Sequence, residues 1–176
     1  MPAKTYTGAA DVELSDYRYV KWVGKTKGGK AVQIELDHAI CKSNPSWTFA
    51  EKNETTAEAE FEGCYEDEAL ETGDLTEPWK LTDSEGTTQT GNAAIILGVG
   101  KFYIGTSAED AACVGLTRGG GSFVVEREYR DINADGDPGS VVGRVTKDTA
   151  RPKLKLVALQ WLDKVDKLYS CVKTVE

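Results

Sequence analysis

Apolar and polar residues alternate along most of this chain, a pattern typical of β-strands that bury one face. The clearest cases are Val32 to Asp37 and Ala57 to Glu62, where every second residue is apolar. The same pattern, with turn residues between the segments, recurs in YRYVKWV (17–23), SFVVEREY (122–129), VVGRVT (141–146) and KLKLVAL (153–159). We therefore predict a fold that is mainly β.

One segment near the end of the sequence has helical periodicity instead. Its apolar residues recur at spacings of three and four, with charged residues between them: Trp161, Leu162, Val165, Leu168, Tyr169 and Val172. This spacing predicts an amphipathic helix over 161–172 that packs beside the sheet. A short helical turn is also expected between Glu68 and Leu75.

The segment from Thr82 to Asn92 contains no apolar residue and is rich in Thr, Gly, Ser and Asp. Such a segment cannot contribute to a hydrophobic core, so we interpret 82–92 as a linker. It separates an N-terminal half, 4–81, from a C-terminal half, 93–176, and each half contains several predicted strands. A chain of 176 residues has the length of one ordinary domain, and we expect 1–176 to fold as one.

Charge and hydropathy limit the possible partners. Acidic residues number 29 and basic residues 21, for a net charge of −8, which argues against a protein that binds nucleic acid by neutralising phosphates. No apolar run reaches the roughly 18 residues that would span a membrane. The first residues, Met1 to Lys4, lack the apolar core of a signal peptide. We expect synthesis in the cytoplasm and no membrane partner.

Residues that could carry chemistry are few. Zinc-binding spacing is absent from the four cysteines, Cys41, Cys64, Cys113 and Cys171. The single histidine, His38, has no Ser or Cys partner at a recognisable spacing, and no pair of carboxylates stands out among the many. We therefore expect no catalytic residue, no metal site, no cofactor and no enzymatic activity.

One loop resembles the start of an EF-hand. Oxygen-bearing side chains stand at alternate positions, with Gly136 at the sixth: Asp131, Asn133, Asp135 and Asp137. The twelfth position, where a bidentate Glu is required, is Val142, and strands are predicted on both sides. A polar loop is the favoured interpretation, and a calcium-binding or ligand-binding β-sandwich module is the alternative.

The strongest signal is a long predicted hairpin over 122–147, in which a charged alternating strand follows a glycine cluster and a polar loop leads to a second strand. Acidic residues outnumber the two arginines Arg127 and Arg130 in this arm: Glu126, Glu128, Asp131, Asp135 and Asp137. An isolated hairpin that is polar on both faces is hard to stabilise. We expect neighbouring subunits to flank it.

The hairpin also carries a resemblance to a known family. The run VGLTRGGGSFVVEREYRDI (114–132), with GVGKFYIGT (98–106) before it and DG (135–136), GSVVGR (139–144) and KLKL (153–156) after it, is similar to the N-terminal half of phage tail-tube (major tail) proteins. The strands that usually close these proteins are resembled by IELDHAI (34–40), Phe49, AEFEGCY (59–65) and Glu77-Pro78-Trp79. The two halves therefore stand in reversed order. Circular permutation would explain this order, and a fusion of two unrelated halves is the alternative.

The resemblance implies an α+β, mainly β fold: a β-sandwich or partly closed barrel of the tail-tube type, with a flanking α-helix and a long β-hairpin arm. It further implies a structural virion protein, assembled in the host cytoplasm, whose hexameric rings stack into a tail tube. Its partners would be copies of itself and other tail proteins, with DNA passing through without specific binding. A tube subunit of a contractile injection or secretion apparatus is the alternative.

The assembly residues implied by the resemblance lie in the hairpin and just before it. They are Arg118, Gly119, Gly120, Phe123, Glu126, Arg127, Glu128, Tyr129, Arg130, Asp131, Asp135, Gly136 and Arg144.

Overall fold

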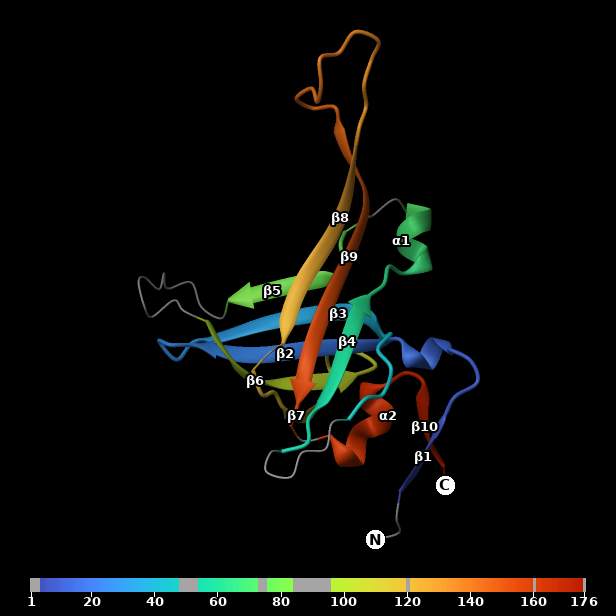
Figure 1. Ribbon diagram of the computed structural model, residues 1–176, viewed down its shortest axis with the longest axis vertical. Coiled ribbons are helices and arrows are strands. Elements are labelled where there is room, and N and C mark those ends of the chain that lie inside the picture. The colour runs from blue at the N-terminus through green and yellow to red at the C-terminus, as the bar shows by residue number, and fades with distance from the viewer. Residues whose placement is uncertain are drawn as a thin grey trace.

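The computed structural model describes residues 4–47, 54–72, 76–83, 96–119, 121–159 and 161–175. Figure 1 shows a body of crossing strands from which one long hairpin projects, so the prediction of a mainly β fold is confirmed. The strands are β1 (Thr5–Gly8), β2 (Arg18–Thr26), β3 (Ala31–Cys41), β4 (Ala57–Gly63), β5 (Trp79–Asp83), β6 (Ile96–Gly105), β7 (Ala112–Leu116), β8 (Ser122–Asp131), β9 (Val145–Ala158) and β10 (Val172–Val175). The α-helices are α1 (Asp67–Thr72) and α2 (Val165–Leu168), and 3-10 turns cover Leu14–Asp16 and Leu162–Lys164.

Strands from both halves of the chain share one antiparallel sheet, in the order β7-β6-β2-β3-β4-β9-β8. Because β3 is long, it pairs with β5 along Val32 to Leu36 and with β4 along Ala39 to Cys41. The N-terminal half supplies β2 to β5, and the C-terminal half supplies β6 to β9. The strands of the two halves therefore hydrogen-bond to each other across the sheet.

The sheet curls until the end of β7 meets the end of β9. The N–H of Arg118 donates to the carbonyl of Val157 at 3.0 Å, and the N–H of Leu159 donates to the carbonyl of Leu116 at 3.0 Å. A bridge between Thr117 and Ala158 lies between these two bonds. Strand β8 remains outside this contact, beyond β9.

The curled sheet encloses one hydrophobic cluster to which both halves contribute. Phe61 of β4 is only 2% exposed, and Phe102 of β6 and Leu156 of β9 are also buried. In β4 the buried residues alternate with exposed or half-buried glutamates, as the sequence pattern predicts. Period-2 burial of this kind places the apolar side chains on the inner face of the sheet.

The predicted helix over 161–172 is much shorter in the structure. A 3-10 turn and α2 end at Leu168, and Val172 begins β10, which pairs with β1 so that Thr5 lies opposite Val175. Pairing with a strand from the other end of the chain replaces the helical hydrogen bonds that the local pattern favours. Sequence periodicity could not reveal this competition, because β1 is distant in the sequence.

Three other boundaries differ from expectation. Residues 141–146 and 153–159 do not form two strands: β9 runs unbroken from Val145 to Ala158, and 141–144 turn, with Gly143 at φ +82°. Helix α1 confirms the helical turn as far as Thr72. Thr82 and Asp83 belong to β5, so the linker was predicted to begin too early. Its remainder, 84–92, lies outside the described residues, as does Phe49.

Candidate assembly surface

Strands β8 and β9 form a long hairpin where the alternation predicts one, but its returning strand pairs along Val145 to Lys155 and not along 141–147. We call the part from Glu126 to Arg151 the arm. The ladder runs from Ser122 opposite Lys155 to Asp131 opposite Val145, with one bulge between Glu128 and Tyr129. In Figure 1 the arm extends well beyond the body. Every residue of β8 from Glu126 onward is exposed, which is why no hydrophobic core holds the arm.

Below the arm, the hairpin packs on the body through one face. Phe123 lies opposite Leu154, and its ring contacts Trp79 of β5 at 5.3 Å between centroids. Val125 lies opposite the buried Pro152. Phe123 therefore anchors the hairpin to the body, and the exposed residues beyond it form the projecting part.

A single carboxylate, Glu77, holds both strands of the arm. Its Oε1 accepts from Nε of Arg127 at 3.0 Å and from Nζ of Lys147 at 2.7 Å. Its Oε2 accepts from Nη2 of Arg127 at 2.8 Å and from the indole N–H of Trp79 at 2.6 Å. The hydrogen bonds from Arg127 above all, and those from Lys147 and Trp79, lower the pKa of Glu77 to about 2. Glu77 is therefore ionised at neutral pH and clamps the base of the arm.

The clamp joins two sequence motifs that lie 50 residues apart. Arg127 belongs to the VEREYR strand and Glu77 to the Glu-Pro-Trp segment. Glu77 was absent from the predicted assembly residues, although its motif was noted as part of the family resemblance. A bidentate pair of this kind fixes orientation as well as distance.

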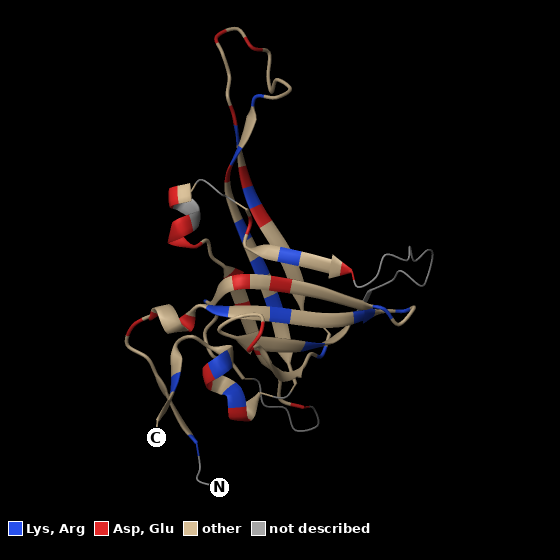
Figure 2. Ribbon diagram, turned by 180° about the vertical axis from the view of Figure 1, so that it is seen from behind, with Lys and Arg blue, Asp and Glu red and all other residues tan. Residues whose placement is uncertain are grey.

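On the opposite face of the arm, charged residues are paired along and across the strands. Glu126 pairs with Lys153 at 2.8 Å, and Arg130 pairs with Asp148 at 3.0 Å. Glu128 and Arg151, both exposed, form no ion pair within the part of the chain that the structure describes. Figure 2 shows positive and negative residues interspersed along the arm, with acidic residues in the loop at its tip.

The tip loop, 132–144, is organised by two of the acidic residues of the EF-hand-like stretch. Asp137 accepts the N–H of Ala134 at 2.7 Å and pairs with Arg144 at 2.8 Å, while Asp131 accepts the hydroxyl of Ser140 at 2.8 Å. These contacts use the carboxylates within the loop. Among the residues that the structure covers, no group of three or more His, Cys, Asp or Glu side chains is placed to hold a metal ion.

The other predicted assembly residues are divided between the tip and the body. Asp135 and Gly136 lie exposed in the tip loop, where Gly136 has a φ of +94°. Arg118 lies where β7 meets β9 and pairs with Glu54 at 2.6 Å, so this residue and the adjoining Gly119 belong to the body. Gly120 lies outside the described residues.

Two strand edges of the hairpin have no partner among the described strands. Strand β8 ends the sheet, so its outer edge is unpaired from Ser122 to Asp131. Strand β9 is paired by β4 only from Lys153 to Ala158, so its edge from Val145 to Pro152 is also unpaired. Unpaired edges of this length are templates for pairing with another chain.

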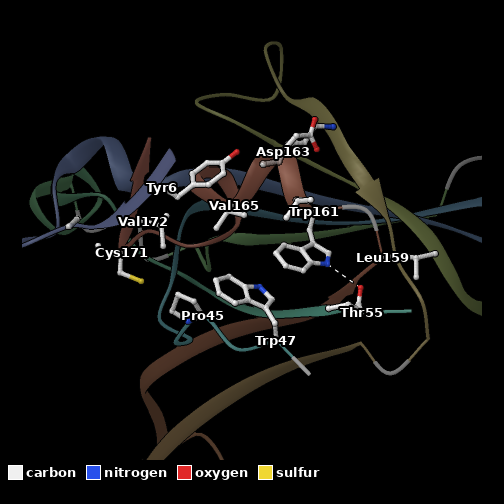
Figure 3. Close-up of a pocket in the computed structure, with 14 residues that line it drawn as sticks. Tyr6, Pro45, Trp47, Thr55, Leu159, Trp161, Asp163, Val165, Cys171 and Val172 are labelled. Atoms are coloured by element: carbon white, nitrogen blue, oxygen red, sulfur yellow. Dashed lines mark hydrogen bonds between the residues drawn. The ribbon is translucent and has the colours of Figure 1, made fainter. Parts of the chain in front are cut away.

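A second surface feature lies near β1 and β10, at the end of the molecule away from the arm (Figure 1). It is an open groove of about 1290 Å³. Trp47 and Trp161 stack beside it with centroids 5.3 Å apart, and the indole of Trp161 donates to the carbonyl of Thr55 at 3.2 Å (Figure 3). The hydroxyl of Tyr6 has no hydrogen-bond partner there among the described residues. Burial, with Asp166 and Asp163 nearby, raises the pKa of Tyr6. Most residues that line the groove are apolar, so it offers mainly apolar contact.

The sequence contains one histidine and four cysteines, and the structure shows the surroundings of His38 and Cys41. His38 is exposed and bonds through Nε2 to Glu66 at 2.7 Å, and the described cysteines are all free thiols. Burial raises the pKa of the Cys41 thiol, which disfavours its reactive thiolate form.

No helix in the described ranges is long and apolar enough to cross a membrane.

No protein-family model matches this chain, and neither a curated protein nor a solved structure does.

Proposed function

We propose that this protein is a tail-tube subunit, a structural protein whose hexameric rings stack into a conduit for phage DNA. In this proposal the curled sheet is the partly closed barrel of the tail-tube type, and the arm is its assembly element. The sequence resemblance supports the proposal through VEREYR and Glu-Pro-Trp, two motifs from different halves of the chain that meet at the Glu77 clamp.

The observation that carries the proposal is that β8 and β9 each have a strand edge in the arm without a partner among the described strands. A ribbon of two strands without a hydrophobic face is marginal in water, and its free edges invite uncontrolled pairing. A closed ring removes both problems, because each subunit covers the edges of its neighbours. The Glu77 clamp supports the same interpretation, because it fixes the direction in which the arm leaves the body.

The positions of the chain ends support circular permutation. Strands β1 and β10 place Thr5 opposite Val175, so a short loop could join them in a relative with the usual order. The other junction joins the two halves of the chain. Asp83, at the end of β5, lies opposite Val32 of β3, next to the turn that joins β2 to β3. Leu97 of β6 pairs with β2 beside the same turn. Both junctions are thus short in space, as permutation requires.

The net charge suits a conduit. At −8 the subunit repels DNA more than it attracts it, so DNA can slide without specific binding. A net negative charge is compatible with many other functions. It therefore supports the proposal only together with the unpaired strand edges of the arm.

The test is the assembly state of the whole chain. Sedimentation velocity and negative-stain electron microscopy should reveal rings, stacked into tubes unless the permuted ends block stacking. Replacing residues 128–149 by Asn-Gly would join Arg127 to Ala150, which already face each other, through a favoured two-residue turn. This variant should remain folded and lose the rings. A wild-type chain that is monomeric at every concentration would contradict the proposal.

A further inference from the structure

We infer that the outer face of the sheet around β2 contacts passing DNA through Lys21, Lys25 and Lys101, with Lys27 beside them. The ligand is the phosphate backbone of double-stranded DNA, bound weakly and without regard to base sequence. The inference rests on the proposed function, since a conduit brings DNA past every subunit, and it means that this face lines the channel.

The pleat of β2 places its lysines on the side of the sheet away from the hydrophobic cluster. Val20 and Trp22 are buried in that cluster, so the alternating residues Lys21, Val23 and Lys25 point outward. Among the described elements, β2 has extensive contacts only with β3 and β6, its neighbours in the sheet. No second layer of described elements therefore covers this face.

Three lysines lie close together on the outer face. Lys101 of β6 is exposed and lies opposite Val23, between Lys21 and Lys25 of the neighbouring strand. Diagonal neighbours in antiparallel strands are about 7–8 Å apart. Lys27, also exposed, follows in the turn after β2, and Figure 2 shows basic residues along β2 and in this turn. Like charges this close repel one another, and an anion that lies across them relieves the repulsion.

The four lysines form no ion pair within the part of the chain that the structure describes. Lys21 instead lies near two aromatic rings, with Nζ 6.0 Å from the centroid of Tyr19 and 5.5 Å from that of Tyr103. Glu35, a half-buried acidic residue at the border of the patch, lies opposite Lys21 on β3. The patch thus keeps an excess of positive charge on an acidic chain.

Phosphates suit this arrangement because lysine ammonium groups act as point charges. They contact phosphate oxygens without the fixed geometry that arginine imposes. Such contacts do not depend on base sequence and let a protein and DNA slide past each other. The lysines follow the direction of β2, so a phosphate backbone that runs along this strand meets them in turn.

The net charge of the chain keeps the contact weak. At −8 the whole subunit repels DNA, but charges more than about 10 Å away are largely screened at 0.1 M salt. DNA that lies against this face is therefore influenced mainly by the nearby lysines. Local attraction opposed by overall repulsion allows contact without tight binding, as passage through a conduit requires.

The experiment measures binding of the whole chain to a labelled DNA duplex of about 30 base pairs by fluorescence anisotropy, at several salt concentrations. The logarithm of the association constant should fall with the logarithm of salt concentration with a slope of about −3, because three to four phosphates are neutralised. Lys25→Gln and Lys101→Gln should each make this slope shallower by about 1. The triple variant with Lys21→Gln added should bind at least about tenfold more weakly at low salt.

The matched control is Lys167→Gln in α2, which removes an exposed lysine elsewhere and should leave the slope unchanged. Far-ultraviolet circular dichroism checks the fold of every variant, and the single variants at exposed Lys25 and Lys101 decide the matter if the triple variant is disturbed. Polyglutamate of equal charge tests the other class of partner, an acidic protein. It should displace DNA less well than unlabelled duplex does, because its charges are more widely spaced.

The outcomes separate the inference from the proposed function. If the chain forms rings but does not bind DNA at low salt, the inference is wrong while the proposed function stands. The same conclusion follows if the lysine variants keep the wild-type slope or if polyglutamate binds more tightly than DNA. A chain that binds DNA through these lysines but never assembles would support the DNA-contacting face and contradict the tube.

Discussion

The body and the arm are built from the same antiparallel pairing, but different forces hold them. In the body, β2, β3, β4 and β6 have partners on both sides, and the sheet buries one face, as Phe61 shows with 2% exposure. In the arm, Tyr129 is 63% exposed, and the two strands have only each other and a few ion pairs. The difference indicates that the body can fold alone, whereas the arm gains from a partner outside the subunit.

The Glu77 clamp lies at the boundary between these two regions. It belongs to the segment before β5 and bonds to both strands of the arm. Its side chain is largely shielded from water, so its ion pairs are less screened than those farther along the arm. The predictions that follow concern the body, this boundary and the tip, in order of decreasing effect.

The largest effect is expected in the body. Phe61→Ala leaves a cavity in the hydrophobic cluster and should lower the free energy of unfolding by about 4 kcal/mol. The matched arm variant, Tyr129→Ala, should change the stability of the monomer by no more than about 0.5 kcal/mol, because its ring is exposed. Urea denaturation of dilute protein measures both. An equal decrease in the free energy of unfolding for the two variants would contradict the view that core packing holds the body but not the arm.

The clamp should have an intermediate effect. Glu77→Gln removes the charge that Arg127 and Lys147 share and should cost about 2 kcal/mol at neutral pH. Lys80→Gln, which removes a more exposed pair with Asp37, is the control and should cost about 0.5 kcal/mol or less. Hydrogen exchange should also show faster opening of the arm in Glu77→Gln alone. Unchanged exchange there would mean that the clamp does not hold the arm.

The pH dependence of the clamp has a defined sign. The pKa of Glu77 is lowered from its usual 4.5 to about 2, so its contribution to stability is complete above pH 4.5 and disappears as the pH falls towards 2. The stability difference between wild type and Glu77→Gln should therefore be constant from pH 7 to about pH 5 and shrink below it. Thermal unfolding across this range tests the sign, and a difference that grew on acidification would contradict it.

The smallest effect is expected at the tip. Gly136 has a φ of +94° with open space around it, so Gly136→Ala adds backbone strain without a clash and should cost about 1 kcal/mol locally. Gly119 also has open space but no positive φ, and Gly119→Ala should have almost no effect. The rate of hydrogen exchange at the amides of the tip loop should be compared between the two variants. The same change in both variants would exclude backbone strain as the cause.

Local patterns in the sequence were sufficient for much of the fold. Alternation in Ala57 to Glu62 and in Ser122 to Tyr129 predicted strands that the structure contains, because burial of one face requires period 2. The presence of a hairpin was predictable for the same reason, although its returning strand, Val145 to Lys155, lies later in the chain than predicted. Of the candidate site, the arm residues Glu126 to Asp131 were identified from sequence because they are contiguous.

Only the tertiary structure decided which distant segments meet. The helix expected over 161–172 gave way to β10 because β1 offered a strand partner, and Glu77 became the clamp because folding brings it to Arg127 and Lys147. It also decided where β4 leaves β9, and therefore which edges remain free. Periodicity records the environment of each residue, whereas pairing depends on competition between segments far apart in the chain, and no local pattern contains that information.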